Sequence, residues 1–272
     1  MIILSRRPVI INIHRVNALI ARHLMSWPRS LERLADAFWW PTINLLIWGF
    51  VTVYLQSRMG GSTFFVNMFL GGLLLWTLVV RSQEDMGITL LQEAWDRNIL
   101  NMFTAPLTIW EFSVATICLA SIKLLLSFIW MFLLAWLIFS FNIFSFGWIL
   151  IPFAIVLMMA GWSLGFIING LIMQFGYRVQ VFAWTLTLAI MPFSAVYYPV
   201  SALPTWMQTV SRALPTSYIF EGMRLGIQSH HLDFAGLGIA FGLDILYLIL
   251  GMKFFSYSYR KAQKSGMIMK FS

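Results

Sequence analysis

The chain has 272 residues, of which 60% are hydrophobic and only 10% are charged, and its mean hydropathy is +0.81. A soluble domain carries about a quarter of its residues as charges and could not hide this much apolar surface, so a soluble enzyme, a nucleic-acid-binding domain and a disordered scaffold are excluded. The apolar residues form long continuous runs, unlike the alternating segments of a membrane β-barrel. The composition therefore predicts an all-α, polytopic membrane protein, in which the excess of 18 Lys and Arg over 10 Asp and Glu holds the cytoplasmic loops in place.

The N-terminal segment, residues 1–36, combines basic and apolar residues at helical spacing. One face of a helix over residues 8–34 would hold Ile13, Val16, Ile20 and Leu24, and another would hold Arg15, Arg22, Ser26, Arg29 and Arg33. This pattern predicts a basic amphipathic helix that begins just after Pro8 and lies in the membrane interface.

Six apolar segments approach the roughly 20 residues that a bilayer-spanning helix needs. They cover residues 37–57, 59–80, about 112–139, about 146–173, 179 to about 198, and about 234–255. An even number of spans places both termini on one side, and most Lys and Arg residues lie in segments on that side, including the tail 259–272. We therefore expect a single transmembrane domain over residues 1–272 in the cytoplasmic (inner) membrane, with both termini in the cytoplasm.

Two charged residues, Lys123 and Asp244, fall within predicted spans. Charges in a membrane are unfavourable, so a functional role is the first hypothesis for both. Lys123 has a structural alternative, because its long side chain can extend to the interface. Asp244 has three: a pair with Lys123, a place in an internal hydrogen-bond network, or a position facing a wet interior.

The segment 81–111, between the second and third spans, is predicted to be cytoplasmic. Leu91, Trp95, Ile99 and Met102 recur at helical spacing, and Glu93, Asp96 and Arg97 share the polar side. This indicates a short amphipathic helix, ended by Pro106, that docks onto a soluble partner. The alternative is an interfacial helix that contacts only lipid, which the two acidic residues disfavour.

The external segment 199–233 is apolar and is interrupted by Pro199, Pro204 and Pro215. We expect two short helices that re-enter the outer half of the membrane, where irregular backbone must be covered by protein or line a wet cavity. Glu221 and Arg224 are three residues apart, so one helical turn could pair them.

Other motifs carry little chemistry. Gly161-Trp162-Ser163-Leu164-Gly165 matches the G-x-S-x-G pattern of serine hydrolases, but it lies inside an apolar span, and no predicted span contains a histidine to act as base. The small-residue pattern Gly161-x-x-x-Gly165 instead predicts close helix packing, and Gly238-x-x-x-Gly242 has the same character. His230 and His231 have no nearby carboxylate or cysteine cluster, so no metal site is expected. The sequence also contains no phosphate-binding G-x-x-x-x-G-K-[ST] loop.

Taken in order along the chain, these features resemble the ABC-2 type transporter permeases, the six-span membrane subunits of ABC exporters. The resemblance rests on the basic N-terminal helix, on Pro106-Leu107-Thr108 followed by Trp110-Glu111, and on two external motifs. The external motifs are Tyr198-Pro199-Val200-Ser201-Ala202-Leu203-Pro204-Thr205-Trp206 and Leu214-Pro215-Thr216-Ser217-Tyr218-Ile219-Phe220-Glu221-Gly222-Met223-Arg224.

The resemblance implies a permease that dimerises with a second copy of itself or a similar chain, and that binds two copies of a cytoplasmic ABC ATPase. ATP and magnesium would be held by that partner, so no catalytic, cofactor or metal site is expected in this chain. Residues 89–103 would form the coupling contact, and its expected residues are Glu93, Trp95, Asp96, Arg97 and Asn98. Residues 199–224 would form the external gate, with Pro199, Pro204, Pro215, Glu221 and Arg224 as its expected residues.

The implied cargo is a hydrophobic or amphiphilic molecule: a drug, a lipid, or a lipid-linked glycan or polysaccharide. Phe38-Trp39-Trp40-Pro41 occupies the place where polysaccharide exporters usually carry a Leu-Gly-x-Leu-Trp-like motif, which favours a drug or a lipid at least equally. Two alternatives stay open: an intramembrane serine hydrolase that uses Ser163, and a membrane scaffold that transports nothing.

Overall fold

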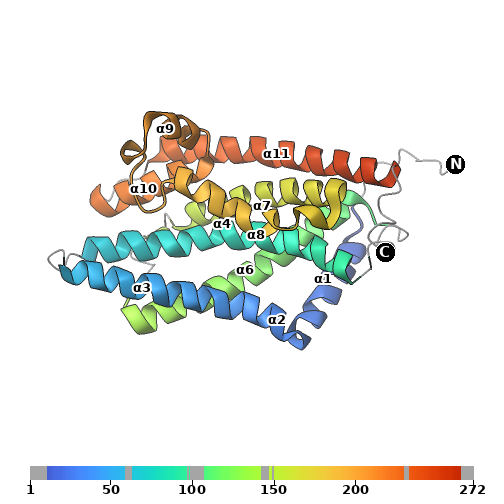
Figure 1. Cartoon of the computed structure of the whole chain (residues 1–272), viewed down its shortest axis with the longest axis horizontal. Helices are drawn as coiled ribbons and strands as arrows, with labels where there is room; N and C mark the ends of the chain where they lie inside the picture. The colour runs from blue at the N-terminus through green and yellow to red at the C-terminus, as the bar shows by residue number, and fades with distance from the viewer. Residues whose placement is uncertain are drawn as a thin grey trace.

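The computed structural model describes residues 11–58, 63–96, 98, 107–141, 147–148, 150–229 and 233–264, and all regular structure among them is helical. Five long helices run along the long axis of the molecule (Figure 1). They are α3 (Trp40–Arg58), α4 (Thr63–Trp95), α6 (Ile109–Phe139), α7 (Leu150–Phe175) and α11 (Phe234–Lys264). Helix α7 is central, because it packs against both α4 and α11.

Four helical segments among the described residues are long and apolar enough to cross a membrane: Ala35–Arg58, Ile109–Phe139, Leu150–Phe175 and Phe234–Lys264. This confirms the prediction of an all-α, multi-pass membrane protein.

Glycines set the closest approach of α7 to its neighbours. A Cβ atom at Gly161 would lie 2.5 Å from Ser82 Cβ and 2.6 Å from the Val79 carbonyl oxygen, and one at Gly165 would lie 2.8 Å from Met86 Cβ. The predicted packing role of Gly161-x-x-x-Gly165 is therefore confirmed, since only glycine lets α4 approach this closely. The same prediction for Gly238 and Gly242 is wrong for the part of the chain that the structure describes, because a Cβ atom there would meet none of those residues within 4 Å.

Helix α4 extends well beyond the predicted span 59–80. It continues without a break to Trp95, so the start of the expected separate cytoplasmic helix belongs to α4. Most of residues 81–94 are buried, and several of their polar groups find partners inside the bundle. The Gln83 amide, for example, donates to the Ala183 carbonyl oxygen at 2.9 Å. Polarity in this stretch therefore marks internal pairing, and the remainder of the expected helix, residues 97 and 99–106, lies outside the described residues.

The predicted fifth span, 179–198, is not one continuous helix. Helix α8 (Phe182–Ile190) passes into a 3₁₀ turn at Met191–Ser194, and Ala195 adopts a left-handed conformation with φ of 53°. Pro192 lies in that turn and has no N–H to continue the α-helical ladder. The apolar stretch Phe182–Ser194 is therefore shorter than a bilayer-spanning helix.

The N-terminal helix differs from its prediction in length and in its buried face. Helix α1 (Ile13–Ser26) is capped by Asn12 and is followed by a 3₁₀ turn at Trp27–Arg29, which contains Pro28. Short helix α2 (Leu31–Leu34) then leads through a π-helical turn, Ala35–Trp39, into α3. Val16, Leu19 and His23 form the buried face of α1, whereas Ile13 is exposed. Helix α1 lies obliquely across one end of the bundle, which we call the α1 end (Figure 1).

The opposite end is formed by α9 (Thr205–Arg212) and α10 (Pro215–Ser229), and we call it the α10 end (Figure 1). These are the two short helices expected in segment 199–233. Helix α10 packs against α4, α7 and α11 and buries Ile219, Phe220 and Met223.

Candidate functional site

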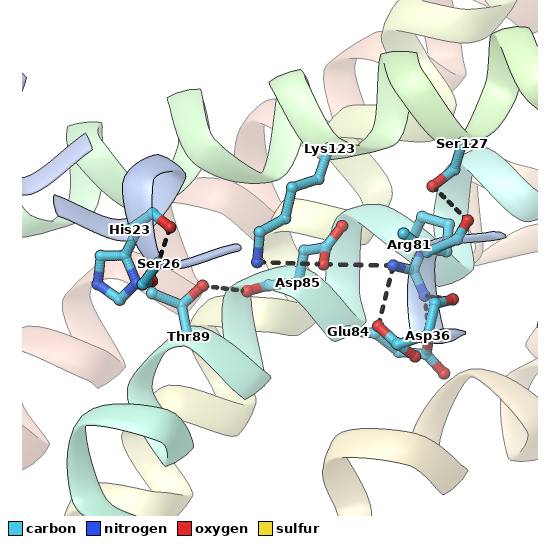
Figure 2. Close-up of polar contacts among 10 residues, drawn as sticks. His23, Ser26, Asp36, Arg81, Glu84, Asp85, Thr89, Lys123 and Ser127 are labelled. Atoms are coloured by element: carbon cyan, nitrogen blue, oxygen red, sulfur yellow. Dashed lines mark hydrogen bonds and ion pairs between the residues drawn. The ribbon is translucent and has the colours of Figure 1, made fainter. Parts of the chain in front are cut away.

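Five charged side chains meet inside the bundle, and we call them the charged cluster: Asp36, Arg81, Glu84, Asp85 and Lys123. Helix α4 supplies three of them at positions i, i+3 and i+4, which face one side of a helix. The π-helical turn supplies Asp36 and α6 supplies Lys123. Figure 2 shows all five side chains directed toward one another.

Arg81 is the centre of the charged cluster. Its Nη2 lies 3.1 Å from Asp36 Oδ2 and 3.5 Å from Asp85 Oδ1, and its Nη1 lies 3.5 Å from Glu84 Oε2. Lys123 Nζ lies 3.7 Å from the same Asp85 Oδ1 (Figure 2). Three carboxyl groups thus share two cations, which leaves a formal surplus of one negative charge.

Both cations and one carboxyl group of the cluster are buried, while the other two carboxyl groups are partly accessible. The side chains of Arg81, Lys123 and Asp85 are 5%, 7% and 3% exposed, whereas those of Glu84 and Asp36 are 16% and 34% exposed. The second oxygen of Asp85, Oδ2, has no hydrogen-bond partner among the described residues. The accessible part of the cluster is therefore made of carboxyl groups.

The position of Lys123 differs from both structural alternatives that the sequence offers. It neither extends to the interface nor pairs with Asp244; it is buried against Asp85. Asp244 lies on α11 with no exposed surface, and neither of its carboxyl oxygens has a hydrogen-bond partner among the described residues. Within the described residues, Asp244 therefore neither pairs with Lys123 nor belongs to an internal hydrogen-bond network.

A cavity of about 720 Å³ runs along α4 from Leu73 to Glu84, between that helix, α3 and α8. Asp36, Arg81 and Glu84 line one end, and large aromatic side chains line much of the remainder. The aromatic residues are Trp40, Trp48, Trp76, Trp184 and Tyr197. We call this the aromatic cavity.

A second cavity, of about 540 Å³, lies nearer the α1 end, and we call it the polar cavity. It shares Asp36, Trp40 and Trp184 with the aromatic cavity and is also lined by Asp85 and Lys123. The charged cluster therefore stands where the two cavities meet.

The end of α4 carries the residues expected to bind a partner. Trp95 is 42% exposed and stacks on Trp184, with 6.4 Å between ring centroids. Asp96 is exposed and lines the polar cavity, whereas Arg97 lies outside the described residues.

Glu93 is bound by side chains of its own chain, whereas the sequence predicts it on an exposed face that docks onto a partner. It is buried and accepts hydrogen bonds from Arg22 and from His23, whose Nε2 lies 2.8 Å from Oε1, and Asn98 donates to its other oxygen at 2.6 Å. Burial raises the pKa of Glu93, but the hydrogen bonds from His23 and Asn98 and the charge of Arg22 outweigh burial and hold that pKa below its ordinary value.

The other end of α1 is held by Glu111, the first acidic residue of α6. Glu111 forms a capping box with Thr108, and its Oε1 also accepts from the Asn12 backbone N–H at 2.9 Å and lies 3.6 Å from Arg15. The capping pattern Thr-x-x-Glu is visible in the sequence. The sequence analysis missed the contacts of Glu111 with α1, and it also missed the charged cluster. The spacing of Arg81, Glu84 and Asp85 at i, i+3 and i+4 indicates only their pairing within α4.

At the α10 end, Glu221 and Arg224 form the expected pair, with 3.2 Å between Arg224 Nη2 and Glu221 Oε1. Arg224 is buried, and its Nη1 donates to the Ala195 carbonyl oxygen at 2.8 Å, while Glu221 accepts from the Val200 N–H at 2.6 Å. The pair thus connects α10 to the segment that follows α8, at Ala195 and Val200. Each proline of this region begins a helical turn: Pro199 and Pro204 are N-caps, and Pro215 is the first residue of α10.

Ser163 shows no arrangement for nucleophilic catalysis. Its buried hydroxyl donates to the Ala160 carbonyl oxygen of its own helix at 2.7 Å. Both histidines within the described residues, His14 and His23, belong to α1. The described residues also contain no group of three or more His, Cys, Asp or Glu that could hold a metal ion.

Together, the long apolar helices define a multi-pass helical membrane protein, with two cavities between its helices. The family model of the ABC-2 type transporter matches residues 15–227, most of the chain, so the chain belongs to that family. This confirms the resemblance found in the sequence, and with it the general function of an ABC-type permease. A comparison with curated proteins found no match.

Proposed function

We propose that this chain exports a hydrophobic or amphiphilic molecule across the cytoplasmic membrane, powered by ATP hydrolysis on a separate ABC ATPase. The observation that carries the proposal is the aromatic cavity, which offers about 720 Å³ inside the bundle of a permease. This volume lies within the range of sites that bind drug-sized molecules. The cavity follows α4, so one helix lines the cavity and also leads to the proposed contact with the ATPase.

The proposed contact with the ATPase is the end of α4. Trp95 and Asp96 are exposed there, and Arg97 and Asn98 follow directly. The Trp95–Trp184 stack connects this end to α8, which forms a wall of the cavity. A force applied at residues 95–98 would therefore reach both α4 and α8.

Glu93 has a positioning role in this proposal. Because it binds Arg22 and His23, it fixes α1 to the end of α4. A movement of that end of α4 would therefore draw α1 with it. Glu111 holds the other end of α1 to α6, so α1 connects α4 to α6.

The external gate is proposed at the α10 end, where the Glu221–Arg224 pair holds the turn after α8. In a permease that works as a dimer with two ATPases, this turn would close the outer end of the pathway. With the α10 end outside, both termini would lie in the cytoplasm, which agrees with the distribution of Lys and Arg along the chain.

The test is co-expression with the ATPase encoded by the neighbouring gene. We expect a stable complex with vanadate-sensitive ATPase activity, and a variant carrying Asp96→Ala and Arg97→Ala that loses the complex or its coupling. Arg212→Ala is the matched control, because it removes an exposed charge at the α10 end of the chain. If the double variant keeps full coupled activity, the placement of the contact is wrong; if no complex forms with the unaltered chain, the proposed function fails.

A further inference from the structure

The charged cluster presents more carboxyl groups than cations to the two cavities: Asp36, Glu84 and Arg81 line the aromatic cavity, and Asp36, Asp85 and Lys123 line the polar cavity. Its most accessible members are the carboxyl groups of Asp36 and Glu84, whereas Arg81 and Lys123 are almost fully buried and already share three carboxyl groups. A ligand that enters the aromatic cavity therefore meets carboxyl oxygens at its charged end.

The surplus carboxyl group has no cation of its own. In a site of low polarity, such a group must be neutralised either by a proton or by another cation. Asp85 shows the same incomplete pairing, because its Oδ2 lies buried at the edge of the polar cavity without a hydrogen-bond partner among the described residues. One additional positive charge would complete the cluster.

The walls of the aromatic cavity are suited to the same ligand. Indole and phenol rings attract cations through their faces and also bury apolar groups. Trp40 and Trp184 line both cavities and therefore stand beside the carboxyl groups, while Trp48 and Tyr197 lie farther along the cavity. A ligand with its charge at Asp36 and Glu84 would place its apolar body against these rings.

We propose that the aromatic cavity, with the charged cluster at its end, binds an amphiphilic organic cation, with an aromatic or branched apolar body and one positive charge, in preference to an anionic amphiphile. The inference rests on the proposed function and names its substrate class. A phosphate-bearing lipid or lipid-linked glycan is disfavoured, because its anionic group would lie against the carboxyl groups of Asp36 and Glu84, while Arg81 and Lys123 are already paired with carboxyl groups of the cluster.

The test compares two probes of nearly the same shape and opposite charge, tetraphenylphosphonium and tetraphenylborate. Their binding to the permease–ATPase complex in nanodiscs is measured by equilibrium dialysis, with empty nanodiscs subtracted. The variants are Asp36→Asn and Glu84→Gln, each of which keeps a hydrogen-bonding side chain. Asp233→Asn is the control, since it removes a carboxylate that caps α11 at the α10 end, and asparagine also caps helices.

We expect each variant to weaken binding of the cation by roughly tenfold. The control should leave it unchanged, and no variant should weaken binding of the anion. Unchanged binding of the cation in both variants, or preferential binding of the anion by the wild type, overturns the inference. Asp36→Asn alone suffices for this decision if Glu84→Gln does not fold, because Asp36 is the more exposed of the two.

Vanadate-sensitive ATPase activity is measured on the same preparations. An active complex that fails to prefer the cation refutes this inference and leaves the proposed function standing. A permease that forms no complex refutes the proposed function and the inference with it.

Discussion

The packing of α7 against α4 yields a sharp prediction about two glycines that look alike in the sequence. Gly161 and Gly238 each begin a G-x-x-x-G pattern in an apolar helix. A methyl group at Gly161 would lie 2.5 Å from Ser82 Cβ and 2.6 Å from the Val79 carbonyl oxygen, whereas one at Gly238 meets nothing within 4 Å. Ordinary carbon contacts need about 3.5 Å, so Gly161→Ala must move the two helices apart by about 1 Å.

The expected effects have opposite signs. Overpacking of this kind destabilises by roughly 1–3 kcal/mol, and the helical preference of alanine over glycine returns at most about 1 kcal/mol. Gly161→Ala should therefore lower the free energy of unfolding, while Gly238→Ala should raise it by up to about 1 kcal/mol.

The assay is thermal unfolding of both variants in the same nanodiscs, monitored by the circular dichroism of the helices. We expect a Tm below that of the wild type for Gly161→Ala and a Tm at or above it for Gly238→Ala. Gly165→Ala serves as a second test of the interface, because its methyl group would lie 2.8 Å from Met86 Cβ. Equal Tm values for Gly161→Ala and Gly238→Ala would refute the reasoning.

Three further predictions concern charged side chains. Arg224→Ala should destabilise the fold by roughly 1–3 kcal/mol, because it leaves the Ala195 carbonyl oxygen without its donor and breaks the pair of buried Arg224 with partly exposed Glu221. An unchanged Tm would contradict this, and Arg224→Lys, which keeps the charge, should lose less. Asp244→Leu should raise the Tm, since it removes a buried carboxyl group that has no hydrogen-bond partner among the described residues; a lower Tm would show that this carboxyl is partnered in the native membrane. Glu93→Gln should lower the Tm at neutral pH by loosening α1. Because the pKa of Glu93 is held below its ordinary value of 4.5, its stabilising contribution is complete above that value and is lost as the pH falls through the lowered pKa, so the Tm difference between wild type and Glu93→Gln should shrink in acid; a constant difference would refute the assignment.

The amino-acid sequence determines the class of the protein and the ends of many of its elements. Its long apolar runs exclude every soluble fold and mark the helices that are able to span a membrane. Local signals were also sufficient for the Glu221–Arg224 pair, because residues at i and i+3 on one helix are neighbours wherever that helix packs. The same holds for the helical turns that begin at Pro199, Pro204 and Pro215.

Burial of polar residues was decided by the tertiary structure. In the sequence, Arg81, Glu84 and Asp85 look like the start of a cytoplasmic loop, because charge normally ends a span. The structure keeps them inside the bundle, since α6 and the turn before α3 bring Lys123 and Asp36 to the same point. No local pattern contains this information, because the partners lie about 40 residues away along the chain.

The net charge of the chain and the charge beside its cavities have opposite signs. The excess of basic residues describes the whole chain, but the accessible charge where the two cavities meet is carboxylate. The sequence determines how much charge the chain carries and which segments are apolar enough to cross a membrane. Only the packing of α4 against α3, α6 and α8 decides which charges meet beside the cavities, because Asp36 and Lys123 reach the charges of α4 from other elements.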